Sequence, residues 1–170
     1  MVNRSLRPAS QEGTRPFPAA SLEITLLEEA QLRAKTRELE LFGQLCRIFD
    51  WQLTRRQRRY YLKSLSDGLT LVLTDLSKTI LWTSRSFLSL TGYTNGEVLG
   101  QTPGLLQGQG TSERVMREAN ERLKRSKSVE VQVKNYRKNG EPYQCRVAID
   151  PMRNGQGDMT HYLAVEQELK

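Results

Sequence analysis

The chain contains few of the residues that build metal and redox sites. Its 170 residues include two cysteines, Cys46 and Cys145, and one histidine, His161. The cysteines are too far apart in the sequence to form a metal-binding or redox motif, and a lone histidine cannot supply a histidine-based metal centre. We therefore expect no metal site and expect both cysteines to be ordinary reduced thiols.

Long apolar runs are also missing. No stretch approaches the roughly 18–20 apolar residues of a membrane-spanning helix, and the N-terminal residues lack the apolar core of a secretory signal. These absences predict a cytoplasmic location and no membrane partner. No nucleophile with a matched base can be assembled, and no acid–base pair is evident among carboxylates such as Asp75, Glu97 and Asp150. We therefore expect no enzymatic activity.

Positive charge is concentrated at the N-terminal end. Of the net charge of +7, residues 1–66 carry +5 and residues 67–170 carry +2. Residues 55–61 hold four arginines and two tyrosines, which can contact phosphates and stack on bases, or form a solvated helix face that pairs with acids such as Glu38 and Glu40. No zinc-finger spacing or RNA-binding sheet motif accompanies them. Nucleic acid is therefore not the expected partner, and a basic-helix nucleic-acid binder stays a third hypothesis.

The N-terminal third divides into a tail and a helical extension. Residues 1–20 are rich in proline, serine, glycine and arginine and predict a disordered tail. Residues 21–66 predict two helices, and two pairs have the spacing of a capping box at a helix start: Thr25 with Glu28, and Thr54 with Gln57. Asp67 and Gly68 predict the end of the second helix.

An apolar stripe runs along this helical extension. Large apolar residues recur there at intervals of three and four: Leu41, Phe42, Leu45, Ile48 and Phe49. Burying one such side chain contributes roughly 1.5–3 kcal/mol, so we expect the stripe to be covered. The cover can be the domain that follows, a second copy of the chain or a partner protein. These five residues are the candidate interface.

After Gly68 the pattern changes to that of an antiparallel sheet with helices. Leu69, Leu71 and Leu73 alternate with polar neighbours, which predicts a half-buried strand. The pattern then predicts a short strand at 80–82, short helices over 83–100, a break at Pro103-Gly104 and a longer helix over 112–127. Three strands follow at 129–133, 143–149 and 159–165, with turns at Asn139-Gly140 and 154–157. This order predicts an α+β domain with the helices on one face of the sheet.

Four stretches, in this order, resemble PAS domains, in particular the light-oxygen-voltage (LOV) branch and its non-photochemical relatives. They are FLSLTGY at 87–93, EVLG at 97–100, LLQG at 105–108 and VQVKNYRKNG at 131–140. The resemblance covers about residues 67–166 and leaves 167–170 as the C-terminal end. It implies a five-stranded antiparallel sheet with short helices across one face, over a cleft that holds flavin, haem or nothing. It also implies an N-terminal helix that crosses the open sheet face and builds a homodimer.

The flavin contacts of the LOV branch are mostly replaced. Where flavin-binding members read Asn-Cys-Arg-Phe-Leu-Gln, residues 102–107 read Thr-Pro-Gly-Leu-Leu-Gln. Pro103 stands at the photoactive cysteine and has no thiol, so a light-driven cysteinyl–flavin adduct is chemically impossible there. The other replacements are Thr102, Gly104, Cys145 and Glu166. Only Gln107 and Asn135 keep the family's residues, and they are the candidate cofactor-binding pair.

Two of these residues have a second interpretation. Asn135 shares a strand face with valines, so its amide needs a partner, which can be a ligand or a hydrogen bond to backbone or to Gln107. Cys145 is interpreted as a small apolar filler. We expect no cofactor and keep flavin mononucleotide (FMN) as the alternative.

The resulting hypothesis is a sensory and regulatory PAS module for signal transduction. It acts through protein–protein association, as a homodimer and with an unknown signalling partner, with or without a small-molecule ligand. The alternative is an FMN-binding photosensor or redox sensor without the adduct cysteine. Because about four residues follow the last predicted strand, with no kinase, cyclase or DNA-binding domain after it, output is expected through association unless the chain is a fragment.

Overall fold

A computed structural model describes residues 19–170, in two units that comprise residues up to Arg33 and residues 34–170. Most of the predicted tail, residues 1–18, lies outside the described residues. Helix α1 (Ala19–Ile48) begins six residues before the predicted start at Thr25. The Thr25 hydroxyl donates instead to the Ser21 carbonyl inside the helix, as threonine side chains can. In the first unit, five large apolar side chains of α1 are more than half exposed: Leu22, Ile24, Leu26, Leu27 and Leu32.

The second unit begins with the end of α1 and continues into α2 (Arg55–Ser66). The capping box at Thr54 is confirmed, because its hydroxyl accepts from the backbone N–H of Gln57 while the Gln57 side chain accepts from the backbone N–H of Thr54. Gly68 ends the helical region with a φ of +78°, a left-handed conformation that favours glycine.

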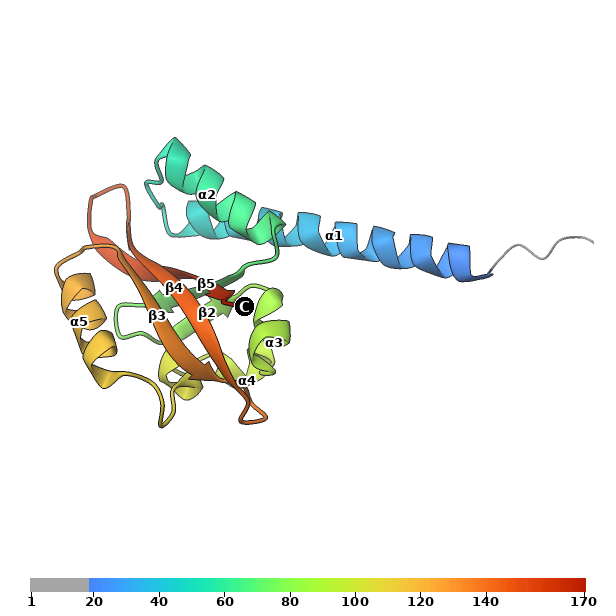
Figure 1. The fold of residues 1–170 in the computed structure, drawn as a ribbon. Coiled ribbons are helices and arrows are strands. Elements are labelled where there is room, and N and C mark those ends of the chain that lie inside the picture. The colour runs from blue at the N-terminus through green and yellow to red at the C-terminus, as the bar shows by residue number, and fades with distance from the viewer. Residues whose placement is uncertain (1–18) are drawn as a thin grey trace, which may run out of the picture. The chain divides into compact units, whose positions relative to one another are not determined.

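Five antiparallel strands form one sheet, as predicted (Figure 1). They are β1 (Thr70–Asp75), β2 (Ile80–Thr83), β3 (Val129–Tyr136), β4 (Pro142–Arg153) and β5 (Met159–Glu168). Their order across the sheet is β2-β1-β5-β4-β3, which places the last strand beside the first, in the middle of the sheet. The hairpin predicted at Asn139-Gly140 joins β3 to β4, and Gly140 has a φ of +86°.

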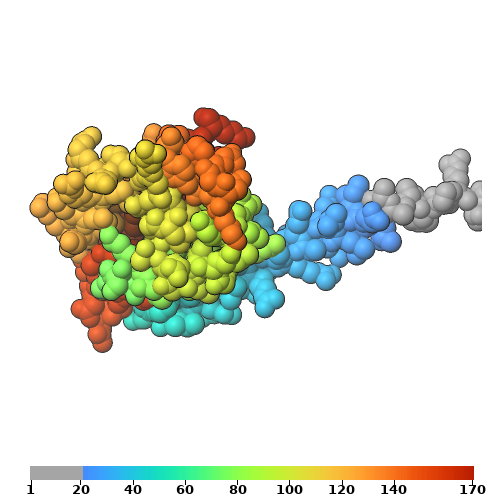
Figure 2. All heavy atoms as spheres, turned by 90° about the horizontal axis from the view of Figure 1, so that it is seen from below, coloured from blue at the N-terminus to red at the C-terminus, as the bar shows by residue number. Residues whose placement is uncertain are grey.

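Helices lie on both sides of this sheet. The segment between β2 and β3 forms α3 (Ser86–Thr91), α4 (Asn95–Val98), the 3₁₀ helix η1 (Pro103–Leu106) and α5 (Glu113–Lys124). Figure 2 views the molecule from this side, where the green to yellow segments cover the sheet. The end of α1 and α2 pack on the opposite face. The short helices on one face and the preceding N-terminal helices are both as predicted.

The prediction that the first strand is half-buried was wrong, because β1 is buried on both faces. Leu71 and Leu73 pack in a core with Phe42 of α1 and Tyr61 of α2. Val72 points the other way and packs under the helical roof. The leucines share one face, as the sequence pattern indicates, but the opposite face is also buried, because Val72 lies under the helical roof.

The predicted interface stripe divides between buried and exposed positions. Phe42 is 1% exposed within the chain's own core, and Leu45 and Phe49 pack against the edge of that core. Leu41 and Ile48 stay exposed, and Ile48 is 72% exposed. The domain itself therefore covers part of the stripe, and Leu41 and Ile48 remain available to a second copy or a partner.

The loop before α5 packs tightly on β3 at Gly108. A Cβ added there would lie 2.5 Å from Cε2 of the Tyr136 ring, whose hydroxyl accepts from the backbone N–H of Gly110 at 2.9 Å. We expect Gly108→Ala to displace the ring and to lower the free energy of unfolding by about 1–3 kcal/mol in urea titrations. The control is Gly96→Ala, since a Cβ on Gly96 meets nothing within 4 Å. Equal stabilities of the two variants would contradict this packing.

Candidate ligand cavity

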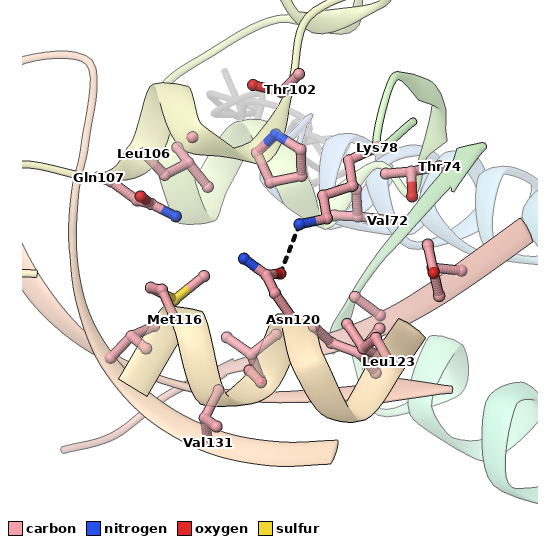
Figure 3. A pocket seen from close by; sticks show the side chains of 18 of the residues that line it. Val72, Thr74, Lys78, Thr102, Leu106, Gln107, Met116, Asn120, Leu123 and Val131 are labelled. Carbon is pink, nitrogen blue, oxygen red and sulfur yellow. Dashed lines mark hydrogen bonds between the residues drawn. The ribbon is translucent and has the colours of Figure 1, made fainter. Parts of the chain in front are cut away.

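A cavity of about 290 Å³ lies between the inner face of the sheet and its helical roof (Figure 3). Its floor comes from β1, β3, β4 and β5, and its roof from η1 and α5. The walls are largely apolar and include Val72, Leu106, Met116, Leu123, Val131, Val147 and Ile149. Apolar walls with a few convergent polar groups are typical of small-molecule sites, and this volume is at the small end of their range.

The pairing of β1 with β5 shows which side chains lie at each position along the cavity floor. Thr74 pairs with Tyr162, Val72 with Ala164, and Thr70 with Glu166. Because paired residues point to the same face, the Tyr162 and Glu166 side chains both face the roof and are four residues apart along β5. At about 3.3 Å per residue, this separation is about 13 Å. The polar groups of the floor therefore lie at separate places, with apolar residues between them.

A hydrogen bond joins two residues of the cavity wall, Lys78 and Asn120. Lys78 follows β1 in the turn to β2, and its Nζ donates to Oδ1 of Asn120 on α5 at 2.5 Å (Figure 3). Burial, with the nearby Lys124 ammonium, lowers the pKa of Lys78. This bond connects the sheet side of the cavity directly to α5.

Glu166 is the acidic group of the cavity wall. It is 5% exposed, and its Oε2 is buried without a hydrogen-bond partner. Burial raises the pKa of this carboxyl to about 7, because desolvation disfavours its charged form. The sequence analysis identified Glu166 only as a residue that replaces a flavin-contacting glutamine of the LOV branch. The signal that could have found it is its place in the alternation of β5, on the same face as Tyr162 and Ala164.

The structure brings the two predicted pocket residues into the same cavity wall. Gln107 comes from the end of η1, and Asn135, which is buried, comes from β3 opposite Tyr143. Thr102, Pro103 and Gly104 also line the roof. The binding role of Gln107 and Asn135 stays a prediction.

Cys145 lies in the core of the sheet and is not one of the residues that line the cavity. Its side chain is fully buried beside Val133 and Val147, and burial raises the pKa of its thiol to about 12. A thiol with this pKa is almost entirely protonated at neutral pH and is a poor nucleophile. These surroundings are those of an apolar filler.

The remaining candidate features lie away from the cavity. The four arginines of residues 55–59 are exposed on α2, and Glu38 is engaged elsewhere, since its Oε1 accepts from the backbone N–H of Arg85 at 2.5 Å. Within residues 19–170, no three His, Cys, Asp or Glu side chains gather as a metal site would require. Over the same residues, no helix has both the length and the apolar character to cross a membrane.

Comparison with known proteins agrees with this architecture. A blue-light-activated histidine kinase of Brucella anthropi is 31% identical over 90 residues, which are 53% of this chain and 18% of that protein. Phototropin-2 of Oryza sativa subsp. japonica is 33% identical over 87 residues, which are 51% of this chain and 10% of that protein. The matched region thus spans less than a fifth of these relatives.

Solved structures of isolated LOV domains are also similar to this chain. A LOV domain from a study with a flavin analogue has a TM-score of 0.60 and 31% identity, over 65% of this chain and 85% of its own. The LOV domain of Aureochrome1 in its light state has a TM-score of 0.58 and 27% identity, over 64% and 88% of the two chains. The family model described as PAS domain matches residues 66–169, more than half of this sequence. The chain therefore belongs to the PAS domain family, in its LOV-like branch.

Proposed function

We propose that this sensory PAS module holds a small ligand in the cavity under α5 and acts through self-association along α1. The observation that carries this proposal is the two-sided burial of β1. Val72 lines the cavity on one face, and Leu71 and Leu73 contact the core around Phe42 on the other. A change of packing in the cavity therefore has a short physical route to α1, of the kind that switching proteins require.

The exposed apolar residues of α1 favour a second copy as the partner. Leu27, Ala34, Leu41 and Ile48 recur every seven residues in the sequence, as one core position of a heptad repeat does, and Ile24 lies three residues before Leu27. All but Ala34 are large apolar residues that the chain leaves exposed. When this row of residues on one helix packs against the same row on an identical helix, both copies use the same surface, so the interface would be isologous.

Light scattering coupled to size-exclusion chromatography tests the dimer. We expect a dimer for the unmodified chain and a monomer for the double variant Leu27→Glu/Leu41→Glu, since it would bury four unpaired carboxylates in the interface. Leu99→Glu is the matched control, because Leu99 is exposed outside α1, and this variant should stay dimeric. A strictly monomeric unmodified chain at high concentration, or a double variant that remains dimeric, contradicts the proposal.

The blue-light-activated relative and the LOV domain studied with a flavin analogue favour a second candidate, a flavin-binding sensor, with FMN as the flavin. Pro103 and Gly104 in the roof and Glu166 in the floor count against it, because they remove the thiol, the phosphate-binding cation and an amide donor. We expect the purified protein to show no flavin absorbance, and added FMN to undergo no light-driven adduct formation. Stoichiometric FMN in the native mass spectrum would establish the second candidate instead.

A further inference from the structure

The Glu166 carboxyl is buried, and one of its oxygens lacks a hydrogen-bond partner. Its side chain is almost fully buried at the cavity floor, and its Oε2 accepts no hydrogen bond. An ionised carboxylate without a partner in an apolar site is strongly disfavoured, and buried polar groups in folded proteins are nearly always paired. Because no described residue supplies a hydrogen bond to Oε2, either a bound molecule supplies it or the carboxyl is protonated.

Among residues 19–170, no cationic side chain compensates this carboxyl, because burial alone accounts for its raised pKa. Among the described residues that line the cavity, the titratable side chains are Lys78, Tyr162 and Glu166. Lys78 is bonded to Asn120 and follows the far end of β1, beyond the Thr74–Tyr162 pair. On β4, Val147 lies opposite Glu166, while Cys145 and Tyr143 follow on the same face of the sheet. The pKa of each of these two groups is raised mainly by burial and further by the Glu166 charge, and the Tyr143 hydroxyl is likewise buried without a hydrogen-bond partner.

The chemistry of the site defines the missing partner. An ionised carboxylate only accepts hydrogen bonds, so its partner must be a donor, and a charged donor makes the stronger bond. The walls around Glu166 are apolar, with Val131 and Val147 in the same row of the sheet. A matching molecule has a cationic nitrogen at one end and an apolar or aromatic body.

We propose that the cavity binds a small organic cation, an amine or amidine on an apolar or aromatic body, whose N–H groups donate to Glu166. This inference rests on the proposed sensor function and names the ligand class of its cavity. It assigns Glu166 as the residue that selects the ligand, and the apolar walls as the surface that holds its body.

Calorimetric titration with three matched probes tests the assignment. The probes are 2-phenylethylamine, 2-phenylethanol and phenylacetate, which share one ring and differ in the charge of the end group. At pH 8 we expect the amine to bind the unmodified chain about ten- to a hundredfold more tightly than the alcohol, the usual effect of a charge-assisted bond, and phenylacetate not to bind. Amine binding should also strengthen from pH 6 to pH 8, as Glu166 ionises.

Two variants separate the role of Glu166 from a change in folding. Glu166→Gln should lose the preference for the amine and keep the alcohol affinity, which shows that its cavity is intact. Glu130→Gln removes an exposed carboxyl from the edge strand β3 and should bind all probes like the unmodified chain. Equal amine affinity in Glu166→Gln, or no amine binding to the unmodified chain, overturns the inference.

Light scattering on the same samples distinguishes this inference from the proposed function. A dimer that binds no amine excludes the cationic ligand and leaves self-association intact. A monomer that binds the amine through Glu166 supports the ligand assignment and excludes the dimer.

Discussion

Phe42→Ala is expected to lower the free energy of unfolding by about 3–5 kcal/mol, the usual cost of deleting a buried phenylalanine ring. Phe42 of α1 is 1% exposed, and its ring centroid lies 5.8 Å from that of Tyr61 in the core that includes Leu71 and Leu73. Loss of the ring leaves a cavity between helix and sheet. Urea denaturation followed by circular dichroism measures the effect, at one fixed protein concentration because self-association adds to the apparent stability.

The control for this prediction is Leu88→Ala. Leu88 is an exposed apolar residue of α3, so its truncation should change the free energy of unfolding by no more than about 0.5 kcal/mol. If the two variants were equally stable, α1 would not be docked through Phe42, and the proposed route from β1 to α1 would be lost with it.

Glu166→Gln is expected to have the second large effect, and that effect depends on pH. The folded-state pKa of Glu166 is about 7, above its ordinary value of 4.5, so the folded chain holds a proton that the unfolded chain releases. The stability from this group is complete below pH 4.5 and is lost as the pH rises through 7, by about 3 kcal/mol in total. The glutamine variant cannot ionise and should not show this loss.

The measurement is the difference in unfolding free energy between Glu166→Gln and the unmodified chain, from urea titrations between pH 5 and pH 8.5. The variant should gain stability relative to the unmodified chain as the pH rises. Glu130→Gln, which changes an exposed carboxyl, should give a nearly constant difference. A flat curve for Glu166→Gln would show that the buried carboxyl ionises without penalty.

Local signals in the sequence predicted local structure well. The capping box at Thr54, the turn at Asn139-Gly140 and the end of the helical region at Gly68 are all confirmed, because each depends on a few neighbouring residues. The helix start predicted at Thr25 was wrong for a local reason as well. A threonine hydroxyl can form a hydrogen bond inside a helix as readily as it can cap one.

Features that depend on distant segments could not be predicted. Both faces of β1 are buried because α1 and α2 cover the leucines and the helical roof covers Val72, and the pattern along one strand carries no information on two separate covers. Gln107 and Asn135 were found through the family resemblance and do meet in one cavity. The unpaired oxygen of Glu166 depends on how several distant segments close over β5, which no motif encodes.

The strand β1 has a mechanical consequence for the sensor. Protein interiors are packed about as densely as organic crystals, so once a molecule fills the cavity beside Val72, β1 has close-packed neighbours on both faces. If an incoming molecule pushes Val72 by a fraction of an ångström, Leu71 and Leu73 must move against Phe42 by a similar amount. In a strand with one solvent-exposed face, the side chains on that face could move into solvent and transmit nothing. In β1, the side chains on the second face contact α1, so the movement reaches the helix.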